Sequence, residues 1–489
     1  MSIILYQVHT RLWLLQLTQT LGQPATLDDI PDAELSRIAG LGFNWLYLLG
    51  IWQTGQIGLR LARSNQQLVL EIRQILLDAS EADICSSCFA ITGYTVPGEW
   101  GGNAALERLL HRLHRHGLRL MLDFIPNHTA IDHPWVQEHP EYYVPGNPNK
   151  RKHAPLSYLK VQTTTQSKIL AHGRDPNFPA WSDTLQLNYG QPALQSAMAD
   201  ELVKAAALCD GLRCDMAMLV MPEIFERTWG ITATPFWPQA IARVKQSQPG
   251  FTFLAEVYWN LEASLLQQGF DYAYDKPLYD LLRNQHAHPL REYLSSAATY
   301  QAHLARFLEN HDEPRAAKIF PDGVHQAAAV IAYFAPGMRF VHQGQLEGCQ
   351  LHLPVQLCRM PQEPVDSSLQ GFYHRLLVAL PVTRPLLDTW QMLKPAPAWD
   401  GNWTWEGFIG YAWKSTAGKH FLVVVNYSPH QSQCYFSLPI PELRERICQL
   451  HDWFSSAVYI RPGDGLLDRG LYLDLPGWGY HLFEIIISP

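Results

Sequence analysis

The chain has 489 residues, of which 47% are hydrophobic and 17% charged, and its formal net charge is −8. This composition is typical of a globular enzyme and excludes a disordered or fibrous chain, while the length suits a barrel with insertions and one small appended domain. Because no run of Lys and Arg amounts to a basic patch, the sequence offers nothing for recognition of a phosphate backbone, and we expect no nucleic-acid partner.

The N-terminal stretch from Met1 to Leu17 is apolar in places, but Gln7, His9 and Arg11 interrupt it. It has neither a basic start nor a small-residue cleavage site, so it predicts a first strand rather than a signal peptide. No run of about 18 or more uncharged apolar residues follows, and we expect no membrane span. The eight cysteines are scattered, with one lone CxxC at Cys85 and Cys88. They predict reduced, mostly buried thiols in a cytoplasmic protein.

Strand-like and helix-like segments alternate along the first quarter of the chain. In order they are Ile3–Thr10 (strand), Asp32–Leu41 (helix), Phe43–Leu49 (strand), Asn103–His116 (helix) and Leu118–Phe124 (strand). Such alternation predicts a parallel sheet. From His128 to about Gly190 the periodicity lapses in a stretch rich in Pro, His, Asn and Tyr. That stretch is too long for an ordinary strand-to-helix loop and predicts an inserted subdomain at the strand tips.

The same alternation resumes after the insertion and then changes character. It runs through Leu194–Cys209 (helix), Gly211–Asp215 (strand), Pro238–Gln248 (helix), Phe251–Glu256 (strand), Phe270–Tyr274, Lys276–Asn284 (helix), Ala305–Asp312 (strand), Val324–Phe334 (helix) and Met338–Val341 (strand). From about Pro397 the pattern predicts only strands: Phe408–Lys414, His420–Asn426, Gln433–Leu438, Leu471–Leu475 and Gly479–Ile487. We therefore expect a parallel α/β barrel followed by a small antiparallel β-domain.

Three of the predicted strands end in an acidic residue: Asp215, Glu256 and Asp312. The tips of parallel barrel strands converge on one rim, so these carboxyl groups should meet there. Arg213 lies two residues before Asp215 and therefore points to the same side of its strand. Its guanidinium should lower the pKa of Asp215 and keep that group ionised. A purely structural Arg–Asp pair, and three unrelated surface acids, are the alternatives.

Converging acids repel one another, so at least one should have a raised pKa and hold a proton while another stays ionised. Cleavage of a glycosidic bond requires that division of roles. One carboxylic acid protonates the leaving oxygen, and one carboxylate attacks or stabilises the sugar cation. The pattern of acids therefore indicates glycoside chemistry.

Four short segments strengthen this interpretation: Asp123–His128, Gly211–Asp215, Leu254–Tyr258 and Phe307–Asp312. In order and spacing they resemble the four signature stretches of the α-amylase superfamily, glycoside hydrolase family 13. The resemblance implies a (β/α)8 TIM barrel, with an inserted subdomain after the third strand and a C-terminal antiparallel β-domain. It predicts a catalytic barrel over residues 1–127 and 191–390, the insertion over 128–190 and a C-terminal β-sandwich over 391–489.

The resemblance also implies roles for individual residues. Asp215 matches the family's nucleophile, Glu256 its general acid/base, and Asp312 the residue that holds sugar hydroxyls and steadies the transition state. The expected substrate-binding residues are Arg213, His128, His311 and Asp123, the last being the structural acid of the first motif. Neutral imidazoles can bind hydroxyls without adding fixed charge to a crowded site, although either histidine taken alone could be structural.

Aromatic residues near the strand tips are the expected stacking surfaces for sugar rings. Phe89 occupies the place where the family often has a stacking Tyr, so stacking would survive without the phenol's hydrogen bond. Trp52, Trp100, Trp135 and Trp259 could also stack on sugars, and core packing is the alternative reading for each.

One position raises the question of a metal ion. Asn127 matches a residue that binds structural calcium in many relatives, and Asp175 and Asp183 are the partner candidates. Calcium needs six to eight oxygen ligands, which one Asn does not supply. We expect no required cofactor, and a structural calcium at Asn127 stays an open alternative.

The sequence thus predicts a retaining α-glycoside hydrolase that acts on oligosaccharides or glucans by double displacement. The alternatives are a transglycosylase, in which a sugar hydroxyl or phosphate replaces water, and an inactive carbohydrate-binding homologue. Met218 and Leu219 stand where many starch-cleaving relatives carry a Lys-His pair that binds glucose units beyond the cleaved bond. Because two hydrogen-bonding residues are replaced by apolar ones, we expect a preference for short substrates.

Overall fold

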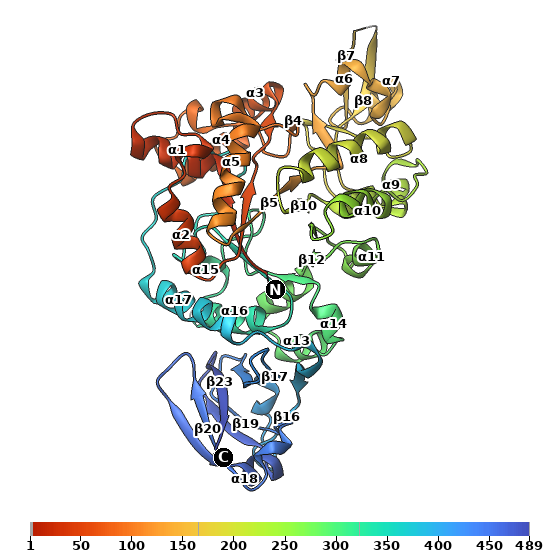
Figure 1. The fold of residues 1–489 in the computed structure, drawn as a ribbon. Coiled ribbons are helices and arrows are strands. Elements are labelled where there is room, and N and C mark those ends of the chain that lie inside the picture. The colour runs from red at the N-terminus through yellow and green to blue at the C-terminus, as the bar shows by residue number, and fades with distance from the viewer. Residues whose placement is uncertain (1–2, 165, 322, 489) are drawn as a thin grey trace.

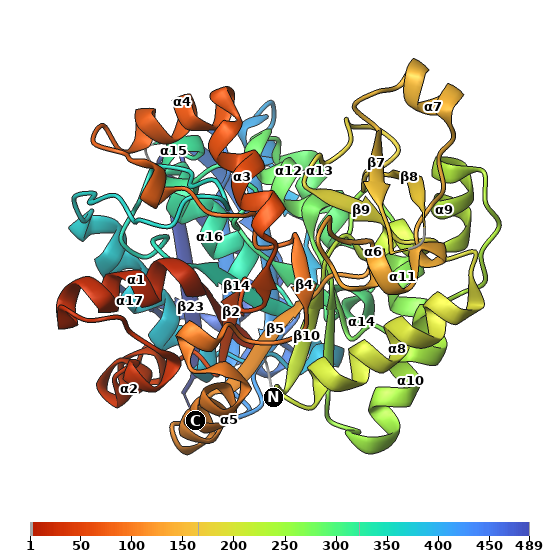
Figure 2. The same ribbon diagram turned by 90° about the horizontal axis from the view of Figure 1, so that it is seen from above.

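The computed structural model describes residues 3–164, 166–321 and 323–488. Eight parallel strands close into a barrel in chain order (Figures 1 and 2). They are β1 (Ile4–His9), β2 (Trp45–Leu49), β5 (Arg119–Phe124), β10 (Gly211–Cys214), β11 (Thr252–Ala255), β12 (Tyr272–Tyr274), β13 (Leu304–Arg306) and β14 (Met338–His342). The predicted (β/α)8 fold is confirmed. A strand that is covered on both faces has apolar residues at nearly every position. Strand β2 is an example, since all five residues of its Trp-Leu-Tyr-Leu-Leu sequence are buried.

Helices surround the barrel and pack an apolar stripe against it. In α5, Ala105, Leu106, Leu109 and Leu113 are the buried residues, at the spacing of one helix face. The α-helices of the barrel part are α1 (Thr10–Leu21), α2 (Asp32–Gly40), α3 (Gln56–Ser64), α4 (Gln66–Ile75), α5 (Gly102–Arg115), α8 (Pro192–Ala206), α9 (Pro222–Trp229), α10 (Trp237–Ser247), α11 (Glu262–Gln267), α12 (Lys276–Arg283), α13 (Ala287–Leu294), α14 (Ala298–Gln301), α15 (Ala316–Ile319), α16 (Val324–Phe334) and α17 (Ser367–Val382). No helix within the described residues has the length and apolarity needed to cross a membrane.

The excursion between β5 and α8 carries its own small sheets beside the strand tips. Strand β6 (His128–Ala130) pairs with β9 (Thr184–Gln186), and β7 (Tyr158–Gln162) forms a hairpin with β8 (Ser167–Ala171). The short helices α6 (Trp135–Glu138) and α7 (Pro148–His153) lie between them. A further two-stranded sheet, β3 (Gln53–Thr54) with β4 (Ile91–Gly93), follows β2. Figure 1 shows the excursion at the end of the molecule remote from the C-terminal sheets.

Two antiparallel sheets form the C-terminal part. One has the strand order β15-β17-β18-β23-β20-β21 and the other β16-β19-β22. Their elements are β15 (Gln391–Leu393), β16 (Pro395–Ala396), β17 (Phe408–Lys414), β18 (His420–Asn426), β19 (Ser432–Phe436), β20 (Ile447–Asp452), β21 (Val458–Pro462), α18 (Gly463–Asp468), β22 (Leu471–Leu475) and β23 (Tyr480–Ile487). The Tyr411 hydroxyl bonds the carbonyl of Ile331 at 3.0 Å, which ties the larger sheet to α16.

The predicted strand ends need correction, most of all in β13. The strand expected over Ile3–Thr10 is Ile4–His9, and helix α1 begins at Thr10. The strand expected to end at Asp215 ends at Cys214, and that expected over Ala305–Asp312 is only Leu304–Arg306. Barrel strands are short, so the apolar residues after each tip pack as helix or turn instead, a difference that periodicity alone does not resolve.

Candidate active site

Strand register brings two of the predicted acids to one level. Cys214 at the end of β10 pairs with Ala255 at the end of β11, so Asp215 and Glu256 are the first residues beyond neighbouring strands. The Asp215 amide donates to the carbonyl of Phe124 at 2.8 Å, and the Glu256 amide donates to that of Cys214 at 3.0 Å. Both carboxyl groups therefore leave the sheet at the same rim.

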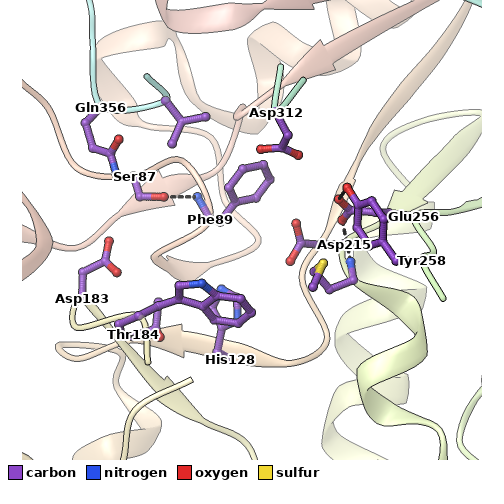
Figure 3. A pocket seen from close by; sticks show the side chains of 13 residues that line it. Ser87, Phe89, His128, Asp183, Thr184, Asp215, Glu256, Tyr258, Asp312 and Gln356 are labelled. Carbon is purple, nitrogen blue, oxygen red and sulfur yellow. Dashed lines mark hydrogen bonds between the residues drawn. The ribbon is translucent and has the colours of Figure 1, made fainter. Parts of the chain in front are cut away.

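A cavity of about 370 Å³ opens at this rim (Figure 3). It is large enough for a sugar unit and part of its neighbour, within the range of small-molecule sites. Five predicted residues line it: Phe89, His128, Asp215, Glu256 and Asp312. The lining residues that the sequence analysis did not assign to the cavity are Ser87, Trp181, Asp183, Thr184, Met216, Tyr258, Val355 and Gln356.

Arg213 does not line the cavity; its side chain is fully buried and joins the two acids. One terminal nitrogen donates to Asp215 Oδ1 at 2.7 Å, and the other donates to Glu256 Oε2 at 2.7 Å. Asp123 Oδ1 accepts a hydrogen bond from the same guanidinium at 3.4 Å, and Asp123 Oδ2 accepts one from the Gly50 amide at 2.8 Å. Asp123 is 1% exposed and does not line the cavity, a position that suits the structural acid of the first motif.

The three acids differ in protonation. Burial raises the pKa of Asp215 to about 6, although Arg213 acts in the opposite direction. Burial raises the pKa of Glu256 further, to about 7, again against Arg213 and with the help of Asp215. For Asp312, partial enclosure raises the pKa, but His311 outweighs it and the pKa falls to about 2. Near neutral pH one carboxyl group thus retains much of its proton while the other two are ionised.

This finding corrects one expectation about Arg213. The guanidinium was expected to lower the pKa of Asp215 below its usual value, yet that pKa is raised. Two facts explain the difference. Asp215 is 5% exposed, so desolvation disfavours its charge. Arg213 also divides its hydrogen bonds between two carboxylates, so each receives only part of its stabilisation.

The predicted histidines occupy different positions. His128 lines the cavity, and burial lowers its pKa to about 4, which makes it the neutral imidazole that was expected. His311 is 4% exposed and lies behind Asp312, with Nε2 3.1 Å from the Asp312 carboxylate. Its Nδ1 lies 3.0 Å from the Gln7 amide nitrogen, so Gln7 orients the ring. Figure 3 shows Phe89 between Asp312 and His128.

The side chain of Asn127, the position considered for calcium, is paired with the side chain of Gln186. Its side-chain oxygen accepts from Gln186 Nε2 at 2.9 Å, and its amide donates to Gln186 Oε1 at 3.2 Å. Asp175 Oδ1 accepts from the Asn177 amide at 2.6 Å, while Asp183 lines the cavity. Across residues 3–164, 166–321 and 323–488, no group of three or more His, Cys, Asp or Glu side chains could hold a metal ion.

None of the four tryptophans proposed for stacking lines the cavity. Trp52 is fully buried and donates to the Asp123 carbonyl at 2.7 Å, so its role is packing. The indole in the wall belongs to Trp181, whose ring centroid is 5.1 Å from that of His128. Trp181 lies in the irregular insertion, where no periodicity marks which side chains turn toward the rim.

All eight cysteines are free thiols.

Comparison with known proteins gives consistent matches. The family model for the alpha-amylase catalytic domain matches residues 89–354. Alpha-amylase 3 of Dictyoglomus thermophilum is 22% identical over 326 residues, which cover 60% of this chain and 61% of that protein. Trehalose synthase/amylase TreS of Mycobacterium tuberculosis is 25% identical over 249 residues, covering 45% and 41%. The chain therefore spans less than two thirds of the length of these curated relatives.

A solved structure is similar over nearly the whole chain. The maltogenic alpha-amylase AmyB of Thermotoga neapolitana superposes with a TM-score of 0.70 at 18% identity, covering 99% of each chain. At this identity the likeness concerns the fold.

Proposed function

The chain belongs to the α-amylase family, and from that premise we propose that it is a retaining hydrolase of α-glucosidic bonds in oligosaccharides or glucans. The observation that carries the proposal is the pair Asp215 and Glu256, held by one guanidinium at the barrel rim with pKa values of about 6 and 7. An ionised nucleophile beside a protonated acid is what the first step of double displacement needs.

The proposed mechanism assigns one task to each acid. Glu256 protonates the glycosidic oxygen as Asp215 attacks the anomeric carbon, which forms a covalent glycosyl intermediate and releases the aglycone. Glu256 then takes a proton from water, which attacks the same carbon and frees Asp215. Asp312, whose pKa is lowered to about 2, stays anionic and accepts hydrogen bonds from sugar hydroxyls. Phe89 offers its ring face to the sugar.

The test is a substrate panel of α-glucans, maltose, sucrose, trehalose and maltose 1-phosphate, followed by product analysis and NMR of the first product formed. We expect release of a sugar in the α configuration. A β-configured first product would reject the retaining mechanism, and absence of turnover on every substrate would reject the hydrolase proposal. The Asp215→Asn protein serves as the inactive control.

A second candidate is a transglycosylase, because one relative that the chain matches is named a trehalose synthase/amylase. The same panel separates the two reactions. Transfer yields a new disaccharide or products longer than the substrate, whereas hydrolysis yields only shorter ones.

The pKa values predict the pH dependence of the reaction. Below about pH 6 Asp215 gains a proton and ceases to be a nucleophile, and above about pH 7 Glu256 loses the proton it must donate. We therefore expect a narrow bell-shaped profile of kcat/KM with its maximum between these values; the two limbs belong to the coupled pair. A profile that stays flat up to pH 9 would contradict the role of Glu256.

We also propose that the enzyme needs no calcium at Asn127, since Gln186 satisfies both ends of that amide. Dialysis against a strong chelator should leave kcat/KM and the melting temperature unchanged. In contrast, Gln186→Ala should lower the free energy of unfolding by about 1–3 kcal/mol, because a buried amide loses its partner. A chelator-induced fall in melting temperature that added calcium reverses would overturn this proposal.

Long glucans should be poor substrates. Met218 is fully buried and Leu219 is 3% exposed, so neither side chain can bind glucose units beyond the cleaved bond. Each hydrogen bond missing there weakens binding by about 0.5–1.5 kcal/mol. In soluble-starch digests we expect slow loss of viscosity and early release of short sugars. A rapid viscosity drop at the rate of a typical endo-amylase would show that other loops compensate.

A further inference from the structure

The two oxygens of the Glu256 carboxyl group have different surroundings. Oε2 accepts from an Arg213 nitrogen at 2.7 Å and from the Met216 backbone amide at 2.6 Å. Both partners are obligatory donors, so a proton on Oε2 would point at another hydrogen. Oε1 accepts only from the Tyr258 hydroxyl among the described residues, at 3.0 Å.

The backbone of Met216 is held in an unusual conformation that makes its contact with Oε2 possible. Its φ angle is 42°, in the left-handed region that residues with side chains seldom adopt. The next amide, that of Ala217, donates to the backbone carbonyl of Glu256 at 3.0 Å. Two consecutive amides of the turn after β10 are thus bonded to one residue of the turn after β11. A strained backbone conformation of this kind persists only where several surrounding contacts hold it, and such conformations cluster at functional sites.

Resting on the proposed function, we propose that Oε1 alone carries the catalytic proton of Glu256 and that Tyr258 is a positioning residue that directs this oxygen at the leaving group. Glu256 and Tyr258 both line the cavity, and Figure 3 shows the two side chains side by side at its edge next to Asp215. Oε2 is already occupied by the Arg213 guanidinium and the Met216 backbone amide.

A phenol suits both states of the acid. A hydroxyl donates to Oε1 when Glu256 is ionised and accepts or turns aside when Glu256 is protonated. Donation to the ionised form stabilises it and favours transfer of the proton to the glycosidic oxygen. The other charged groups that act on Glu256 are Arg213, Asp215 and Asp312, and none of them bonds Tyr258 in the described structure.

The test is the Tyr258→Phe enzyme, assayed on an unactivated disaccharide and on α-glucosyl fluoride. We expect kcat/KM on the disaccharide to fall about 3- to 10-fold, the loss of one hydrogen bond. The rate on the fluoride, which needs little protonation, should change less than about 2-fold. The basic limb of the pH profile should move up by about half to one unit, because the anion of Glu256 loses a donor.

Tyr189→Phe is the matched control, since that buried hydroxyl donates to the Pro126 carbonyl at 2.8 Å and does not line the cavity. This control should leave unchanged both the ratio of the rates on the disaccharide and the fluoride and the position of the basic limb of the pH profile. If Tyr258→Phe does not fold, 3-fluorotyrosine at position 258 replaces it; this more acidic phenol donates more strongly and should move the basic limb down.

An equal loss on both substrates with no shift of the limb would overturn the proposal and leave Tyr258 a packing residue. That outcome is distinct from failure of the proposed function, in which the wild-type enzyme itself would turn over none of the panel.

Discussion

Asp215→Asn should lower kcat by a factor on the order of 10⁴ or more, the scale seen when a covalent nucleophile is removed. The amide is nearly isosteric with the carboxyl group, so no cavity opens. It can still accept from Arg213, which lies 2.7 Å from Oδ1. The fold should therefore persist while the covalent step is lost.

The measurement is steady-state turnover of the best panel substrate, with circular dichroism and thermal unfolding as checks of the fold. The matched control is Asp210→Asn, which changes an acid just before the same strand, at the opposite end of the barrel. Asp210 accepts from the Leu120 amide at 2.8 Å, remote from the cavity, and the Asn oxygen can still accept there, so this variant should keep both its fold and its kcat. Wild-type turnover by Asp215→Asn would show that the nucleophile is another residue.

Glu256→Gln should lower kcat/KM on unactivated glycosides by about 10²–10⁴-fold, the usual contribution of general acid catalysis. With α-glucosyl fluoride the first step needs little protonation, so Asp215 should still attack. The second step lacks its base, and the covalent glycosyl enzyme should accumulate.

Intact-protein mass spectrometry detects that intermediate as a mass increase of one glycosyl unit, and an added small anionic nucleophile such as azide should release it. No adduct should form on the Asp215→Asn/Glu256→Gln protein. If Glu256→Gln lost activity equally on all substrates and formed no adduct, Glu256 would have a structural role and not that of the acid.

Much of this site follows from local sequence. A strand that ends in an acid puts the acid at the barrel rim, and alternation along the strand puts Arg213 on the side of Asp215. These rules involve neighbours in the chain, so they predicted the positions of Asp215 and Glu256 and the contact between Arg213 and Asp215. They could not show that the guanidinium also bonds Glu256, because that contact depends on the register of β10 against β11.

The tertiary structure alone decided the remaining properties of the site. Burial raises the pKa of Asp215 where the neighbouring Arg213 led us to expect a lowered one, and solvent exclusion depends on the whole closed barrel. The amide pair of Asn127 and Gln186 joins residues far apart in the chain. Trp181 enters the cavity wall from an insertion that has no periodicity to reveal its direction. Sequence patterns report on local geometry, whereas desolvation and contacts across the barrel arise only when distant segments are brought together.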